Sequence, residues 1–127
     1  MERTSKPRHW WLAVAAVNGA VAVAAGAFAV HGLKSQLAPD ALQVFETGAR
    51  YQMYHALALG LAAFAPASPG RTVSSWAFLA GIVLFSGSLY ALAMTGVRGW
   101  GLVTPFGGVA FLLGWIALAW AAIRERR

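Results

Sequence analysis

Residues 10–30 read WWLAVAAVNGAVAVAAGAFAV, and this stretch decides the fold because its 21 residues include no charge. A helix needs roughly 20 mainly apolar residues to cross the hydrocarbon core of a bilayer. Two further uncharged runs, Trp76–Met94 and Trp100–Ile123, hold 19 and 24 residues. The sequence therefore predicts an integral membrane protein whose main surrounding is the lipid bilayer.

The segment between the first two runs is more polar and predicts another helix. Pro39 suits the first turn of a helix, where its missing N–H group costs nothing, and no further helix breaker occurs before Pro66. The helical period places the polar side chains of the first half on one face, whereas the segment from Ala56 onward is apolar all round. We expect an amphipathic lead-in over residues 39–50, which starts at the membrane surface and then enters the bilayer.

The expected fold is a single all-α domain over residues 1–127, an integral membrane bundle of four transmembrane helices. The spans are expected at about residues 10–30, 49–66, 73–95 and 100–123. Four helices of this length use most of the chain, which leaves no room for an extramembrane catalytic domain. The composition agrees, because 11% of the residues are charged whereas soluble domains carry about 25%.

The composition also excludes several classes of site. The chain has no cysteine, so disulfides, thiolate metal sites and cysteine nucleophiles are ruled out. Its formal net charge of +6 comes largely from short basic tails at the two ends. Nucleic acid is not an expected partner, because these tails do not form a basic patch interleaved with aromatic residues.

The distribution of lysine and arginine predicts the orientation, since cytoplasmic loops carry an excess of both. With four spans, one side holds Arg3, Lys6, Arg8, Arg71, Arg124, Arg126 and Arg127, and the other holds Lys34, Arg50 and Arg98. Both termini are therefore expected in the cytoplasm, with the protein in a bacterial plasma (inner) membrane. A cleaved secretory signal is the alternative, because residues 27–29 fit a cleavage site. The apolar run is longer than that of a signal peptide, and we keep it as a transmembrane helix.

Small residues mark the expected helix contacts. Ala22 and Gly26 form a small-xxx-small step that lets another helix approach closely. Gly107 and Gly114 lie seven residues apart on one face of the last helix and predict a packing groove. Leucine at Gly107 or at Gly87 is expected to lower the stability of the bundle.

Polar side chains at membrane depth are costly unless paired, so each one is a candidate for function. We expect those around the start of the second span to meet the ends of the first and fourth helices on the non-cytoplasmic side. Together they would form a small polar pocket or a purely structural network. The candidate residues are Asn18, His31, Gln43, Glu46, Arg50, Tyr51, Gln52, Tyr54, His55, Ser86, Ser88, Tyr90 and Thr104.

Asn18 lies near the middle of the first span, where a hydrogen bond between helices is the expected role and ligand contact the alternative. His31 and His55 could in principle ligate haem or a metal. No HxxxH spacing or carboxylate cluster supports such a site. We therefore expect structural pairing of each histidine, for example with Tyr51, Gln52 or a backbone carbonyl, and no cofactor or metal.

Glu46 and Arg50 are four residues apart with the acid first, the favourable order for an ion pair along a helix. An interfacial salt bridge is the expected role. The alternative is a polar entrance for a proton or a small anion, lined by these two residues and Tyr54. Sequence signatures of hydrolases, metalloproteases and nucleotide-binding proteins are absent, and no catalytic residue is expected.

Four ordered motifs carry a resemblance to a known family. They are GAFAVHGL over 26–33, FETGARYQMYHAL over 45–57, LFSGSLY over 84–90, and TPFGG over 104–108 followed by Gly114 and Trp115. The chain resembles the YgdD/YwdK family of small membrane proteins, a domain of unknown function with bacterial inner-membrane and mitochondrial members. Ala29 stands where the family often has glycine. The resemblance implies four spanning helices and supplies no reaction, cofactor or catalytic residue.

These observations favour a non-enzymatic membrane protein that works through partners, as a small accessory or assembly component. Its partner would be another membrane protein or a second copy of itself, because the closely spaced small residues favour helix association. The alternative is a small oligomeric transporter or channel for a proton or a small solute, since four helices alone enclose little volume. A membrane enzyme or haem carrier ranks below both.

Overall fold

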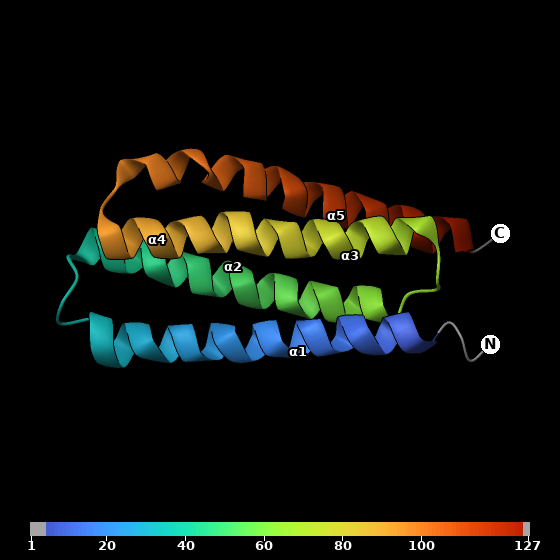
Figure 1. Ribbon diagram of the computed structural model, residues 1–127, viewed down its shortest axis with the longest axis horizontal. Coiled ribbons are helices and arrows are strands. Elements are labelled where there is room, and N and C mark those ends of the chain that lie inside the picture. Colours follow the sequence, from blue (N-terminus) through green and yellow to red (C-terminus); the bar gives the residue numbers. More distant parts are fainter. Residues whose placement is uncertain (1–4, 126–127) are drawn as a thin grey trace.

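The computed structural model describes residues 5–125, and its elements in that range are all helical. These elements form four long helical rods. Figure 1 shows the rods side by side, with both ends of the chain at the same end of the bundle. In chain order the elements are α1 (Ser5–Phe28) with a π-helical turn (Ala29–Leu33), α2 (Pro39–Ala63), α3 (Pro69–Gly81) with a π-helical turn (Ile82–Ser86) that leads into α4 (Gly87–Thr95), a 3-10 turn (Arg98–Leu102), and α5 (Thr104–Glu125).

The predicted all-α membrane fold is confirmed. Within the described residues, three stretches are long and apolar enough to cross a membrane, namely Trp10–Leu33, Pro69–Thr95 and Arg98–Arg124. α2 is not one of them, because its first half carries polar side chains. It nevertheless runs beside the other rods along the length of the bundle (Figure 1).

Residues 39–50, the expected lead-in, form the first part of α2 itself. Phe45 in this part is buried in a hydrophobic cluster with Ala29 and Leu33 from the π-helical turn after α1, and with Ala93 from α4. Pro39 begins the helix, as its fixed φ and missing N–H group favour. This half of α2 therefore packs inside the bundle on one face and carries its polar side chains on the other.

The four rods pack in a defined order. α1 packs mainly on α2, α5 packs mainly on α3, and α2 contacts α3 and α4 and so joins the two pairs. Leu59 of α2, Phe78 of α3 and Phe111 of α5 belong to the larger hydrophobic cluster, which also includes Trp11 of α1. Trp11 meets Trp76 edge to face, with ring centroids 4.9 Å apart, and links α1 to α3.

Glycines allow α3 and α5 to interlock. A Cβ atom on Gly114 would lie 2.5 Å from the Phe78 ring, and one on Gly81 would overlap the Phe111 ring. Each helix therefore receives a phenylalanine ring of the other at a glycine. Gly107 lies against backbone atoms instead of a ring, because a Cβ there would overlap the Phe85 backbone and lie 2.7 Å from its Cα atom. The predicted groove along Gly107 and Gly114 is confirmed.

The other expected small-residue contacts turn out differently. A Cβ atom on Gly87 would meet nothing within 4 Å, so the close contact expected there is wrong. The same holds for Gly26, although Ala22 in the same step is buried. Both glycines leave open space beside a helix.

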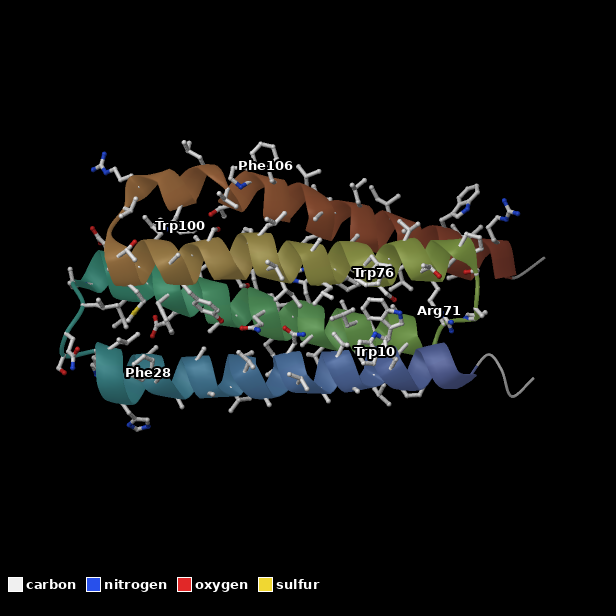
Figure 2. All side chains as sticks on the ribbon, viewed as in Figure 1. Trp10, Phe28, Arg71, Trp76, Trp100 and Phe106 are labelled. Atoms are coloured by element: carbon white, nitrogen blue, oxygen red, sulfur yellow. The ribbon has the colours of Figure 1, made fainter. Side chains whose placement is uncertain are left out.

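Figure 2 shows Trp10, Arg71 and Trp76 toward the end of the bundle that holds the termini, and Trp100 toward the opposite end. Tryptophan is enriched at the two interfaces of a membrane. Phe106 points outward from α5, away from the other rods. The side-chain arrangement therefore fits a bundle whose long axis crosses the bilayer.

Candidate functional site

Three buried or half-buried polar side chains form one hydrogen-bonded chain across the bundle. The Tyr90 hydroxyl of α4 donates to Gln52 Oε1 of α2 over 2.7 Å. Gln52 Nε2 donates to Asn18 Oδ1 of α1 over 3.0 Å, and Asn18 Nδ2 donates to the Val14 carbonyl oxygen over 3.0 Å. The chain of bonds thus joins α4, α2 and α1 and ends on a backbone carbonyl.

This chain lies well inside the expected membrane span, about a third of the way along it from Trp10. Asn18 is eight residues after Trp10 in the 24-residue span Trp10–Leu33, which corresponds to about 12 Å along a helix of about 36 Å. Gln52 is 5% exposed and contacts Asn18 directly, so it lies at the same level. The hydrogen bond between helices predicted for Asn18 is present.

His55 forms a second polar centre, between α2 and α5. Its Nδ1 atom lies 2.8 Å from the Tyr51 carbonyl oxygen, and the Trp115 indole N–H donates to its Nε2 atom over 3.2 Å. The ring stacks on Phe111 with a centroid distance of 3.5 Å and an interplanar angle of 6°. Sequence reasoning anticipated a backbone carbonyl as a partner for His55 and missed Trp115.

The two neighbours of His55 determine its tautomer. An indole N–H can only donate, so Nε2 of His55 must be an acceptor without a proton. A carbonyl oxygen can only accept, so Nδ1 must carry the proton. The imidazole is therefore neutral, and both ring nitrogens are engaged within the bundle.

The structure does not bring the two histidines of the haem hypothesis together. His31 is exposed on the π-helical turn after α1, whereas His55 is buried between α2 and α5. The His31 side chain makes no hydrogen bond or ring contact with the rest of residues 5–125. Within that part of the chain, no group of three or more histidine, aspartate or glutamate side chains lies where it could hold a metal ion.

Hydroxyl groups form a third, smaller centre between α4 and α5. Ser88 Oγ and Thr104 Oγ1 lie 2.6 Å apart, and Ser88 also donates to the Phe85 carbonyl oxygen. Ser86 is fully buried, and its hydroxyl has no hydrogen-bond partner within residues 5–125, as is also true of Ser74 and Ser75 in α3. Enclosed hydroxyls of this kind cannot reach a substrate from solvent or lipid.

The remaining candidates line the outer face of α2. Gln43, Arg50 and Tyr54 are exposed, and Glu46 is half-buried. The Arg50 guanidinium donates to the Thr47 hydroxyl over 3.1 Å. The sequence predicted a salt bridge between Glu46 and Arg50 within one chain. This prediction is wrong, because no ion pair joins the two residues within residues 5–125.

The candidate residues therefore fall into separate groups and do not meet in one polar pocket at the end of the bundle. Asn18, Gln52 and Tyr90 meet in the middle of the bundle, and Ser88 meets Thr104. His31 joins neither group. The sequence signals only the residue types, because the partner of each side chain depends on how the rods pack.

Arg71 is a further residue that sequence reasoning did not single out. It is 5% exposed in the first turn of α3, and its guanidinium donates to the Ala65 carbonyl oxygen, two residues beyond the end of α2. Its backbone N–H donates to the Ser68 hydroxyl, which caps α3. A positive charge beside a helix C-terminus is favourable, so Arg71 fastens the connection between α2 and α3.

Comparison with known proteins places the chain among membrane proteins. Residues 25–108 match a family described as a protein of unknown function (DUF423). UPF0382 membrane protein YwdK of Bacillus subtilis (strain 168) is 45% identical over 118 residues, which cover 90% of this chain and 96% of the relative. UPF0382 inner membrane protein YgdD of Escherichia coli (strain K12) is 45% identical over 126 residues, 94% of this chain and 93% of the relative.

A UPF0382 membrane protein of Haemophilus influenzae is 42% identical over 123 residues, which cover 94% of this chain and 98% of the relative. No solved structure matches the chain. The similarity extends over nearly the full length of each relative. The chain therefore belongs to the UPF0382 (DUF423) family of multi-pass membrane proteins.

Proposed function

We propose that this protein is a non-enzymatic component of the bacterial inner membrane that acts by binding another membrane protein, as an accessory or assembly factor. Its relative YgdD is named as an inner membrane protein, which supports the proposed location in the inner membrane. The same proposal places both termini in the cytoplasm. The argument for a partner comes from the contrast between the inside of the bundle and the outer face of α2.

The inside of the bundle offers no free reactive group to a substrate. The side chains of Asn18, Gln52 and Tyr90 are hydrogen-bonded in one chain, and both nitrogens of His55 are engaged. The three buried hydroxyls without a partner are enclosed. An enzyme needs a nucleophile, acid or base that a substrate can reach, and the interior polar groups do not meet this requirement.

The observation that carries the proposal is the exposed arginine on α2. Gln52 lies about a third of the way along the expected membrane span through its bond to Asn18, and Arg50 is two residues away, a shift of about 3 Å along the helix. An exposed guanidinium at this depth would face hydrocarbon. Ionisable groups inside a membrane nearly always face protein or a water-filled cavity and pair with an acceptor.

A protein surface that offers Arg50 a hydrogen-bond acceptor would remove the free-energy cost of exposing its guanidinium to hydrocarbon. The outer face of α2 continues below Arg50 with Tyr54, Leu57 and Leu61, all of them exposed. A helix of a partner protein lying along this face would cover the polar and apolar halves together. Polar side chains that hydrogen-bond to a neighbouring helix are typical of contacts between membrane helices.

Photo-crosslinking in native membranes tests the proposal. A photoreactive phenylalanine analogue at Tyr54 is expected to give a discrete protein adduct, because this residue lies on the proposed contact face. The matched control carries the same analogue at Leu112, which is exposed on α5 and is expected to label lipid only. Labelling of lipid alone at both positions would contradict the proposal.

The alternative of a small transporter or channel has less support. Its path would have to run along the bundle axis, whereas the Tyr90–Gln52–Asn18 chain runs across it from α4 to α1. Flux of protons or small anions into liposomes, abolished by Glu46→Gln, would establish this alternative. We expect no such flux.

A further inference from the structure

We propose that the partner at the outer face of α2 is a second copy of this chain, and that two copies pair through reciprocal ion pairs between Arg50 and Glu46. This inference rests on the proposed function, since it identifies the occupant of the same surface. Three features of α2 support it: two opposite charges without an ion pair, the direction of the Arg50 side chain, and the spacing of the exposed residues.

The first feature is a pair of opposite charges on α2. Glu46 and Arg50 lie one turn apart on the same side of α2, and within residues 5–125 they do not pair with each other. Each charge alone is costly at membrane depth. A different partner would have to supply both a base and an acid at the correct heights. A second copy supplies both by symmetry, because contacts across a two-fold interface are reciprocal: where Arg50 meets Glu46 of the second copy, Glu46 meets its Arg50.

The direction of the Arg50 side chain fits such an interface. In a dimer with a two-fold axis along the bundle, residues of equal number lie at equal height. Arg50 must then reach one turn toward the N-terminal end of α2 to meet Glu46 of the second copy. Its guanidinium already extends in that direction, because it donates to the Thr47 hydroxyl three residues earlier.

The exposed residues have the spacing of a helix-packing seam. The outer face of α2 opposes the buried residues Gln52, Ala56 and Leu59. Its centre alternates steps of four and three residues, the spacing of two helices that pack with a left-handed crossing. The residues at these positions are Gln43, Thr47, Arg50, Tyr54, Leu57 and Leu61. Two copies of this face would match polar half to polar half and apolar half to apolar half.

Disulfide crosslinking measures the pairing directly, because the chain has no cysteine of its own. In native membranes under a mild oxidant, Leu57→Cys is expected to give a disulfide-linked dimer. Leu112→Cys on α5 is the control for random collisions, since its residue is equally exposed. We expect about tenfold more dimer for Leu57→Cys than for Leu112→Cys. Equal yields would overturn the proposal.

Charge exchange then tests the ion pairs in the Leu57→Cys background. Arg50→Glu gives a chain with two acids at these positions, and Glu46→Arg gives a chain with two bases. Each alone is expected to lower the dimer yield about tenfold, equivalent to about 1.4 kcal/mol. Expressed together, the two variants are expected to crosslink to each other at the parent level, because acid then faces base at both contacts.

Co-expression separates pairing between chains from an effect within one helix, since a defect within either chain would persist in the mixture. Failure of the mixture to recover would overturn the proposal.

If a single-charge variant does not insert into the membrane, the neutral variants Arg50→Gln and Glu46→Gln replace it. Unchanged dimer yields for both neutral variants would overturn the ion pairs. A photo-crosslink from Tyr54 to another protein without a disulfide-linked dimer would reject self-pairing and leave the proposed function standing. If neither kind of crosslink forms, both the self-pairing and the proposed function are rejected.

Discussion

Gln52 is the residue at which three helices are tied together. It accepts from Tyr90 and donates to Asn18, so its amide serves both α4 and α1. A primary amide suits this position because it offers an acceptor and a donor on one planar group. In hydrocarbon or in a packed interior, an unpaired amide would cost far more than it does in water.

Removing the Tyr90 hydroxyl should expose this dependence. Tyr90→Phe leaves Gln52 Oε1 buried without its donor, and we expect the free energy of unfolding to fall by about 0.5–2 kcal/mol. Unfolding with a denaturing detergent in mixed micelles measures the change. Tyr51→Phe is the control, because this residue is exposed on α2 and lies outside the proposed contact seam. A similar loss for both variants would contradict the role assigned to Tyr90.

The hydrogen bond between Trp115 and His55 gives a second prediction at this scale. A double-mutant cycle with His55→Phe and Trp115→Phe should show a coupling energy of about 0.5–1.5 kcal/mol, because either change alone leaves the other group unpaired. Trp120 serves as the control partner for His55, since it lies over Arg124 at the far end of α5. The pair of His55 and Trp120 should be additive, and an additive result for Trp115 would contradict the bond.

Residue types at these sites could be predicted from the sequence, but most of their partners could not. Asn18 stood out as a polar group in the middle of an apolar run, and a bond between helices follows from that position alone. Trp115 gave no comparable signal, because one tryptophan among six in this chain looks like any other interfacial anchor. Its bond to His55, 60 residues away, depends on the packing of α5 against α2.

At the scale of elements, the contact between α3 and α5 is built on glycine. Phe78 and Phe111 each occupy the space left by a glycine on the opposite helix, which lets two helices with apolar surfaces approach closely. Without a hydrophobic driving force between helices in lipid, such close contact is a main source of association. The stability of this pair should therefore depend on individual glycines.

Gly107 and Gly108 provide a matched test within one turn of α5. Gly107→Ala places a Cβ atom against the Phe85 backbone, which cannot move aside as a side chain can. We expect a loss of about 1–3 kcal/mol in the free energy of unfolding. Gly108→Ala meets nothing within 4 Å and should be neutral or stabilising by up to about 1 kcal/mol, because alanine favours the helix. Equal effects at both positions, measured by thermal unfolding in detergent, would contradict this interface.

The sequence predicted the helices better than it predicted their irregularities. Long apolar runs and Pro39 indicated four rods, since length and helix breakers are local signals. The π-helical turns Ala29–Leu33 and Ile82–Ser86 were not anticipated, because an extra residue in a helical turn leaves no mark on an apolar sequence. The open space at Gly87 was also missed, because the neighbours of this glycine depend on how α4 is rotated about its axis.

At the scale of the whole molecule, the sequence could not predict which rods lie side by side. α1 and α5 are apolar on all faces, so no stripe indicates the side that packs inward. Only 17% of the most apolar window of Trp10–Leu33 is buried within the bundle, and 22% of that of Arg98–Arg124. Both rods therefore present most of their surface to lipid or to other proteins, whereas α2 holds the centre.

The topology is the prediction that concerns the molecule as a whole. Both ends of the chain lie at one end of the bundle (Figure 1), as four antiparallel rods require. The start of α1, Arg71 and the end of α5 share that end, and the lysine and arginine residues of the sequence are concentrated beside these segments. The positive-inside rule predicts that this end is cytoplasmic. Alkaline phosphatase, which is active only outside the cytoplasm, should therefore be inactive when fused after Arg127 and active when inserted after Ser35 between α1 and α2. Green fluorescent protein at the same two sites is the reciprocal control, since it should fluoresce only after Arg127. The reverse pattern would invert the bundle and place the basic tails outside the cytoplasm.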